Sequence, residues 1–292
     1  MMKLFNFKEG KRYMFNDIQI GPITLHMYGL MIAIGFLSAL FITLKRSKDK
    51  GLSEDTIYGI FYCAIIGGFI GCRLLFYIVE IPDIIKDPSI LWNFKNGYVV
   101  YGGIIGGIIA AMIYIKKFRK EKFLPYFDLV MPSVSIAQGF GRIGCFCAGC
   151  CYGAQTTSPI HIVFTHSQFA PNNVPLIPTQ LISSAGDFLI GFILIKYSNR
   201  NKVLGRTSSM YLILYGIGRF IIEFFRADYR GSIGFLSTSQ IISMIMVAIG
   251  IVFYMKAPGF NIDVNDEKDS DNSDTNNNYD DNDTNDYYDD ND

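Results

Sequence analysis

Seven long apolar segments run through this chain of 292 residues and constrain its fold more than any other feature. They lie at about residues 24–44, 56–79, 98–115, 125–141, 178–196, 207–225 and 235–255. A bilayer core about 30 Å thick needs roughly 20 helical residues to cross it. The segments do not alternate with a period of two, which disfavours a membrane β-barrel. We therefore expect an all-α, polytopic membrane protein with seven transmembrane helices.

The distribution of basic residues predicts how these helices are oriented. The loops at 45–55, 116–124 and 197–206 together carry twelve lysines and arginines, whereas the opposite loops carry five. Four basic residues near the N-terminus argue the other way but are outnumbered. We expect the N-terminus outside and the C-terminus inside. Residues 1–23 would then form an external arm that precedes a membrane domain at 24–258.

The last part of the chain, residues 259–292, differs sharply in composition. From Asp263 onward there are 13 acidic residues and one lysine, so this segment carries −12. Because the net charge of the whole chain is zero, the residues before it carry +12. A segment this polar cannot bury enough apolar surface to fold, and we expect a disordered acidic cytoplasmic tail. The composition does not suggest nucleic-acid binding.

The predicted topology gathers polar residues in the outer half of the membrane. They are His26, Tyr28, Arg73, Tyr101, Arg142, Arg219 and Glu223. Charged side chains inside a bilayer are costly and persist where they face a bundle interior and find partners. Arginine offers phosphate a planar fork of donors that stays charged. We expect an anion site for lipid headgroups; the alternative is that single arginines, Arg73 above all, extend to the interface.

Three acidic residues in the apolar segments need an explanation. Arg219 and Glu223 are four residues apart and share a helix face, where an ion pair would fix the pose of the guanidinium group. Asp128 and Asp187 lie deeper or toward the inner side. We interpret both as polar packing contacts rather than catalytic groups.

Four of the six cysteines lie close together, at Cys145, Cys147, Cys150 and Cys151. Three interpretations stay open: small apolar free side chains, a disulfide or redox-active pair, and a zinc or iron–sulfur site. The separated cysteine pairs of a usual metal site are missing, and adjacent Cys150 and Cys151 are awkward ligands. We therefore predict no metal.

Six short motifs occur in order between about residues 20 and 255. They begin at His26, Gly71, Tyr101, Gln138, Pro178 and Gly218, and the longest is Gln138-Gly-Phe-Gly-Arg-Ile-Gly-Cys-Phe. Together they resemble the prolipoprotein diacylglyceryl transferase family (phosphatidylglycerol:prolipoprotein). The resemblance implies a multi-pass enzyme of the bacterial plasma membrane, with seven spans, an external N-terminus and an active site that faces the outer leaflet.

The resemblance also implies a reaction. Such enzymes move diacylglycerol from phosphatidylglycerol onto the cysteine thiol of a prolipoprotein lipobox, forming a thioether and releasing glycerol phosphate. It implies catalytic roles for Arg142, Arg219, Tyr101 and Glu223. It implies substrate binding by Arg142, Tyr28, His26, Arg73, Gly153 and Cys145. Because the substrate supplies the nucleophile, we expect no cofactor.

The chain departs from the family pattern at several of these positions. Tyr101 stands where a histidine usually precedes Gly-Gly, and a phenol is a poorer base at neutral pH. Cys145 and Cys150 replace an asparagine and an acidic residue, and Ile182-Ser183 replaces Tyr-Glu. The alternatives are therefore a divergent family member with another lipid or thiol reaction, and a membrane transporter.

Overall fold

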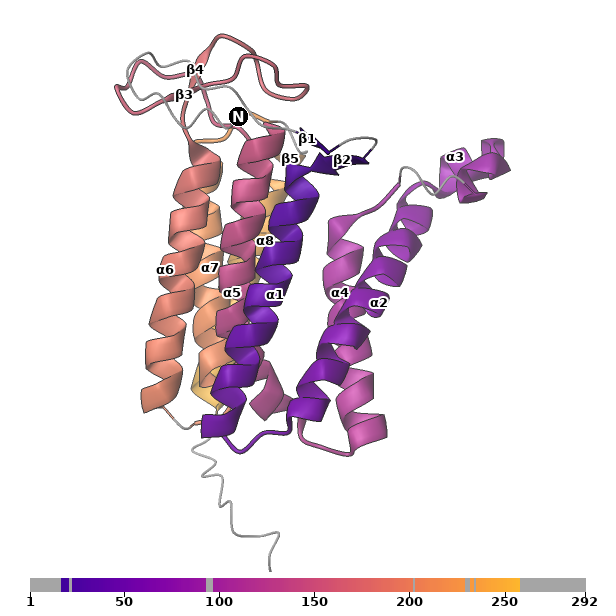
Figure 1. Cartoon of the computed structure of the whole chain (residues 1–292), viewed down its shortest axis with the longest axis vertical. Coiled ribbons are helices and arrows are strands. Elements are labelled where there is room, and N and C mark those ends of the chain that lie inside the picture. Colours follow the sequence, from indigo (N-terminus) through magenta and orange to yellow (C-terminus); the bar gives the residue numbers. More distant parts are fainter. Residues whose placement is uncertain are drawn as a thin grey trace, which may run out of the picture. The chain divides into compact units, whose positions relative to one another are not determined.

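The computed structural model describes residues 17–20, 23–92, 97–201, 203–228, 232–233 and 235–257, and most of them are helical. Each of the seven apolar segments contains one long helix, as the sequence predicted. These helices are α1 (Met27–Asp49), α2 (Glu54–Val79), α4 (Val100–Ile113), α5 (Phe123–Ala148), α6 (Thr179–Arg200), α7 (Arg206–Glu223) and α8 (Thr238–Lys256) (Figure 1). A short helix α3 (Ile81–Lys86) and a turn of 3₁₀ helix, η1 (Pro88–Trp92), follow α2, and α4 continues as the π-helix η2 (Tyr114–Arg119).

The all-α prediction is correct for these segments but missed three antiparallel hairpins. Strand β1 (Asp17–Ile20) pairs with β2 (Ile23–His26), which leads directly into α1. Strands β3 (Ile162–Val163) and β4 (Pro175–Leu176) lie between α5 and α6, and β5 (Ser232–Ile233) and β6 (Leu236–Ser237) precede α8. Of the predicted external arm 1–23, residues 1–16 and 21–22 lie outside the described residues. The predicted tail 259–292 also lies outside them.

Among the described residues, five helices are long and apolar enough to cross a membrane. They are α1, α2, α4 with η2, α6 and α8. The other two long helices, α5 and α7, carry many of the buried polar side chains, including serines and Asp128. The chain is therefore a multi-pass helical protein whose helices bury polar as well as apolar side chains.

Helix packing joins some helices that are consecutive in the chain and others that are not. Helix α5 packs against α1 on one side and α6 on the other, and it also contacts α7. Helix α7 packs against α8, and α2 packs mainly against α4 (Figure 1). The contact between α2 and α4 is close because glycines face each other: a Cβ atom at Gly71 would lie 2.2 Å from the carbonyl oxygen of Gly102.

Buried polar side chains tie α5 to its neighbours. Asp128 of α5 accepts hydrogen bonds from the backbone N–H groups of Gly205 and Ser208, at 2.6 and 2.8 Å. It thereby satisfies donors at the start of α7, which every helix leaves unpaired at its N-terminus. Thr43 of α1 donates to Ser133 of α5 at 2.9 Å. The interpretation of Asp128 as a polar packing contact agrees with these distances.

Substitutions at the glycines between α2 and α4 test this packing. We expect Gly71→Ala to lower the free energy of unfolding by about 1–3 kcal/mol, because its Cβ would meet backbone that cannot move aside. The control is Gly68→Ala on the same helix, where the nearest atom is the Gly103 carbonyl oxygen at an ordinary 3.4 Å. Thermal unfolding in detergent measures both, and equal stability of the two variants would contradict the packing.

Candidate functional site

Helices α5, α6 and α7 line a cavity with a volume of about 230 Å³. Helix α5 contributes Arg142; α6 contributes Ile182, Ser183, Gly186, Asp187 and Ile190; and α7 contributes Tyr215, Gly218, Arg219, Ile221 and Ile222. The two arginines predicted to grip an anion thus reach one cavity from different helices. The rest of the wall is largely apolar, so the cavity suits a phosphate that carries hydrocarbon.

Arg142 lies within ion-pair distance of a carboxylate on the neighbouring helix. Its Nε atom lies 4.0 Å from Oδ2 of Asp187, and the Asp187 side chain is only 8% exposed. This Oδ2 atom accepts no hydrogen bond from any residue that the structure describes. A buried carboxylate with an unused oxygen on the cavity wall can position the guanidinium group and can also accept a proton.

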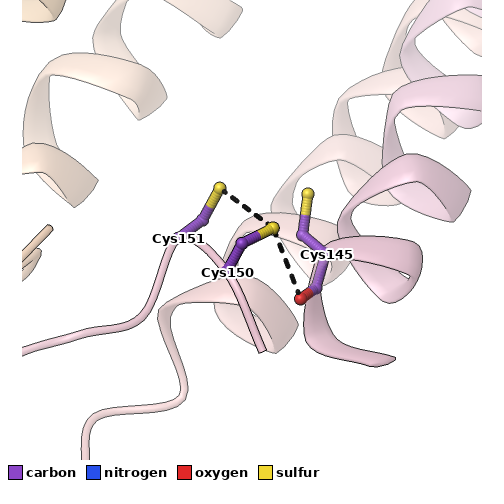
Figure 2. Close-up of side chains that lie close together, drawn as sticks. All are labelled: Cys145, Cys150 and Cys151. Carbon is purple, nitrogen blue, oxygen red and sulfur yellow. Dashed lines mark hydrogen bonds between the residues drawn. The ribbon is translucent and has the colours of Figure 1, made fainter. Parts of the chain in front are cut away.

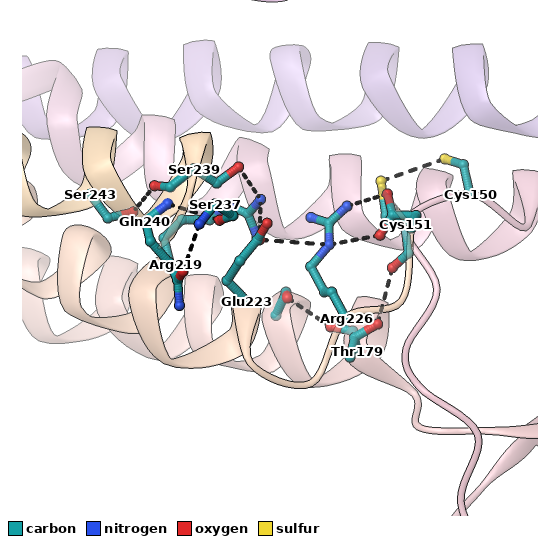
Figure 3. Close-up of polar contacts among 12 residues, drawn as sticks. Cys150, Cys151, Thr179, Arg219, Glu223, Arg226, Ser237, Ser239, Gln240 and Ser243 are labelled. Carbon is teal, nitrogen blue, oxygen red and sulfur yellow. Dashed lines mark hydrogen bonds and ion pairs between the residues drawn. The ribbon is translucent and has the colours of Figure 1, made fainter. Parts of the chain in front are cut away.

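Arg219 belongs to a chain of buried ion pairs. Its Nη2 atom lies 2.8 Å from Oε2 of Glu223 and donates to Ser239 of α8 at 3.1 Å. The same Glu223 oxygen lies 3.7 Å from Nε of Arg226. Figure 3 shows Glu223 between the two arginines. Arg226 in turn pairs with Asp228, with the closest atoms 2.5 Å apart. Glu223 is therefore placed to fix the pose of Arg219 and does not itself line the cavity.

The structure places Arg73 elsewhere. This side chain on α2 is buried, and its guanidinium carbon lies 4.7 Å from the centre of the Tyr77 ring. It donates to the Tyr77 hydroxyl at 2.8 Å and to the carbonyl oxygens of Ile90, Leu91 and Gly97 at 3.2, 3.1 and 3.1 Å. Arg73 joins the segment after α2 to the start of α4. It does not line the cavity, and both its predicted contact with substrate and the alternative that it extends to the membrane interface stay predictions.

Three other predicted residues, at the end of β2 and in the first turns of α1 and α4, do not line the cavity. Tyr101, in the first turn of α4, is 47% exposed. His26 ends β2, and Tyr28 lies in the first turn of α1 beside the end of α5, where its ring would lie 3.1 Å from a Cβ atom at Gly144. Within the described residues none of the three lines the cavity. Their roles in substrate binding and proton transfer also stay predictions.

Gly153 connects the segment after α5 to the end of α7. It forms an antiparallel bridge with Arg226, and Ala154 donates to the Phe225 carbonyl at 2.9 Å. A Cβ atom at Gly153 would lie 2.5 Å from the carbonyl oxygen of Ile177. Only glycine fits this close approach to the backbone of Ile177, and the predicted part of Gly153 in substrate binding stays a prediction.

Three of the clustered cysteines lie together where α5 ends (Figure 2). The sulfur atoms of Cys145, Cys150 and Cys151 all lie within 4.8 Å of one another, an arrangement that could hold a metal ion. Cys147 is outside this group. Hydrogen bonding with the neighbouring thiols, together with burial, raises the pKa of the Cys150 thiol. Without a bound cation, Cys150 is therefore a protonated thiol at neutral pH and a weak nucleophile.

The sequence analysis did not predict that Asp187 and Tyr215 would line a cavity. Asp187 was interpreted as a packing contact, although a carboxylate in an apolar segment needs a partner on another element. That partner is Arg142, which lies 45 residues earlier in the chain, so no local pattern could identify it. Tyr215 precedes the Gly216-Ile-Gly-Arg219 motif by one residue and belongs to the same cavity wall.

A bundle of apolar helices with two largely buried arginines on the wall of one cavity defines a multi-pass helical membrane protein. The model of the family described as prolipoprotein diacylglyceryl transferase matches residues 16–256. The chain belongs to this family, which confirms the resemblance seen in its motifs.

Individual relatives agree with this assignment. A phosphatidylglycerol–prolipoprotein diacylglyceryl transferase of Clostridium tetani is 50% identical over 232 residues, which cover 80% of this chain and 93% of the relative. The enzyme named phosphatidylglycerol–prolipoprotein diacylglyceryl transferase 2 of Clostridium perfringens is 46% identical over 237 residues, covering 81% and 92%. A transferase of the same name from Finegoldia magna is 34% identical over 236 residues, covering 80% and 92%.

The buried ion pairs around Glu223 lead to a stability prediction. We expect Glu223→Gln to lower the free energy of unfolding by about 3 kcal/mol or more, since it leaves two buried arginines with less opposing charge. The matched control is Asp83→Asn, because Asp83 pairs with Lys86 and both side chains are more than half exposed. That change should cost less than about 1 kcal/mol. Denaturant titration in detergent compares them, and a cost for Glu223→Gln no larger than the control would contradict the role of Glu223.

Proposed function

We propose that this protein transfers the diacylglyceryl group from phosphatidylglycerol to the lipobox cysteine thiol of prolipoproteins. The observation that carries the proposal is the pair of guanidinium groups, Arg142 from α5 and Arg219 from α7, on the wall of one largely apolar cavity. Membership of the diacylglyceryl transferase family and the names of its relatives supply the substrates.

The chemistry requires stabilisation of charge rather than a covalent enzyme group. The thiol sulfur forms a bond to the glyceryl carbon as the bond between that carbon and the phosphate oxygen breaks. The bonding electrons leave with that oxygen, glycerol phosphate departs and a thioether remains. Negative charge grows on the leaving phosphate, and Arg142 and Arg219 are placed to stabilise it in a site of low dielectric constant.

Asp187 is the residue that we assign to the thiol proton. Within the described residues it is the one carboxylate on the cavity wall, and its Oδ2 atom is left without a hydrogen bond. The sequence left the acceptor of this proton open, and Tyr101, which stands where a histidine is usual, is exposed and does not line the cavity. Asp187 also lies beside Arg142, so proton acceptance and phosphate binding would take place in one cavity.

The membrane placement follows from the same helices. Seven spans with the N-terminus outside and the C-terminus inside would put the cavity on the side of the outer leaflet, where secreted precursors emerge. The excess of lysines and arginines in the loops at 45–55, 116–124 and 197–206 supports this orientation. Residues 24–258 would then form the membrane domain of a plasma-membrane enzyme, and 259–292 a disordered cytoplasmic tail. Protease protection in intact and lysed cells measures the side of that tail.

Reconstitution tests the activity itself. In vesicles that contain phosphatidylglycerol, we expect a lipobox peptide to gain a diacylglyceryl group, observed as a mass increase on its cysteine. Arg142→Ala and Arg219→Ala should each lower the rate about 10²- to 10³-fold, as loss of one donor to a developing oxyanion does. Exposed Lys86→Ala is the control and should leave the rate unchanged. No mass increase with folded protein, or full activity of both arginine variants, would contradict the proposal.

The role of Asp187 predicts a characteristic pH dependence. We expect Asp187→Asn to lower kcat about 10²- to 10⁴-fold at neutral pH, with little change in phosphatidylglycerol binding. The loss should shrink as the pH rises toward about 8.5, because the peptide thiol then ionises in solution and needs no acceptor. The rate and lipid binding are measured across this range. A loss that stays constant with pH, or that appears in lipid binding alone, would assign Asp187 to positioning only.

A further inference from the structure

The proposed reaction assigns no step to the cysteine cluster, and the predicted contact of Cys145 with substrate stays a prediction. Helix α5 ends at Ala148, and Gly149 adopts the left-handed conformation, with φ of 72°. The chain therefore reverses, and the N–H group of Cys150 donates to the carbonyl oxygen of Cys145 at 3.1 Å. This turn returns the Cys150 thiol to the end of the helix, where Cys145 lies (Figure 2).

The backbone conformation of Cys151 allows its sulfur to lie near that of the adjacent Cys150. It has a φ of 60°, a conformation that residues with side chains rarely adopt. This local turn brings its sulfur to 3.8 Å from the sulfur of Cys150, although consecutive side chains of an extended strand point to opposite faces. The objection from spacing alone, that two adjacent cysteines cannot serve one ion, therefore does not hold here.

The sulfur positions match the geometry of a thiolate metal site. Bonds of about 2.3 Å from zinc to sulfur in a tetrahedron place the sulfurs about 3.8 Å apart. The Cys150 and Cys151 sulfurs are at 3.8 Å, and all three sulfurs lie within 4.8 Å of one another. A disulfide would instead need sulfurs at about 2.05 Å. The Cys151 side chain is buried, while Cys145 and Cys150 are partly exposed, so an ion has a path to the site.

The loop that carries Cys150 and Cys151 is hydrogen-bonded to side chains at the start of α6. Gln180 donates from Nε2 to the Cys150 carbonyl at 2.9 Å, and Thr179 donates from Oγ1 to the Cys151 carbonyl at 3.0 Å. Gln180 and Thr179 are each only 1% exposed. Buried hydrogen bonds thus fix the backbone on which two of the thiols stand, which is the support that a preorganised metal site requires.

We propose that Cys145, Cys150 and Cys151 bind one thiophilic divalent cation of the zinc class. Three bonds form between the ion and sulfur, the three thiol protons pass to solvent, and a water molecule completes the tetrahedron. No oxidation or reduction takes place. The bound ion joins the end of α5 to the loop that α6 holds. This inference goes beyond the transferase activity and does not depend on it.

Metal binding to the full-length protein tests the proposal directly. Protein purified in detergent with a reductant is loaded with Zn²⁺, freed of excess ion and analysed for metal; Cd²⁺ is then used for the ultraviolet charge-transfer band of cadmium thiolates. We expect one ion per chain, the cadmium band and a higher unfolding temperature. Cys150→Ser and Cys151→Ser should each weaken binding at least tenfold. Cys147→Ser, from the same segment but outside the cluster, should bind as the unchanged protein does.

Three results would overturn the inference. The first is a chain that unfolds cooperatively but retains no zinc and gives no cadmium band. The second is equal loss of binding in Cys147→Ser and Cys150→Ser, which would place the ion elsewhere. The third is a disulfide within the cluster that forms again after reduction even when zinc is present. Unfolding curves for each serine variant separate lost binding from lost structure.

Discussion

The cost of burying a guanidinium charge among apolar helices governs the rest of this structure. Arg142 and Arg219 cannot lose their protons at any ordinary pH, so each must find opposing charge or water. Arg142 lies 4.0 Å from Asp187 of α6, and Arg219 lies 2.8 Å from Glu223 on its own helix. One arginine from each of two helices thereby faces a shared cavity, where a phosphate could accept hydrogen bonds from both.

Contacts from neighbouring elements fix the position of α7, the helix that carries Arg219. Helix α5 contacts α1, α6 and α7, and its buried Asp128 satisfies the backbone donors at the start of α7, the helix that carries Arg219. At the other end of α7, Glu223 and Arg226 continue the ion pairs, and Arg226 meets the backbone of Gly153. The pose of Arg219 therefore depends on residues from both ends of its own helix and on Ser239 of α8.

Much of the fold could be predicted because long apolar segments have few alternatives in a membrane. All seven segments contain helices, and the two arginines that line the cavity could be named from charge within apolar sequence. The partners of the charged side chains in these helices could not be predicted from the sequence. Arg73 binds carbonyl groups of the segment just after its own helix, and Asp187 meets an arginine far away in the chain, so both depend on tertiary contacts. The cysteine cluster depends on two left-handed residues. Gly149 is the kind of residue that commonly ends a helix in this conformation, but the left-handed conformation of Cys151 has no clear signal in the sequence.

The central claim is that two guanidinium groups from different helices hold one lipid phosphate. An experimental structure of the protein with phosphatidylglycerol bound measures this most directly. The account predicts a single phosphate in the cavity between α5, α6 and α7, with its oxygens about 2.8 Å from nitrogen atoms of both Arg142 and Arg219. A headgroup bound elsewhere on the protein, or in contact with only one of the two arginines, would contradict it.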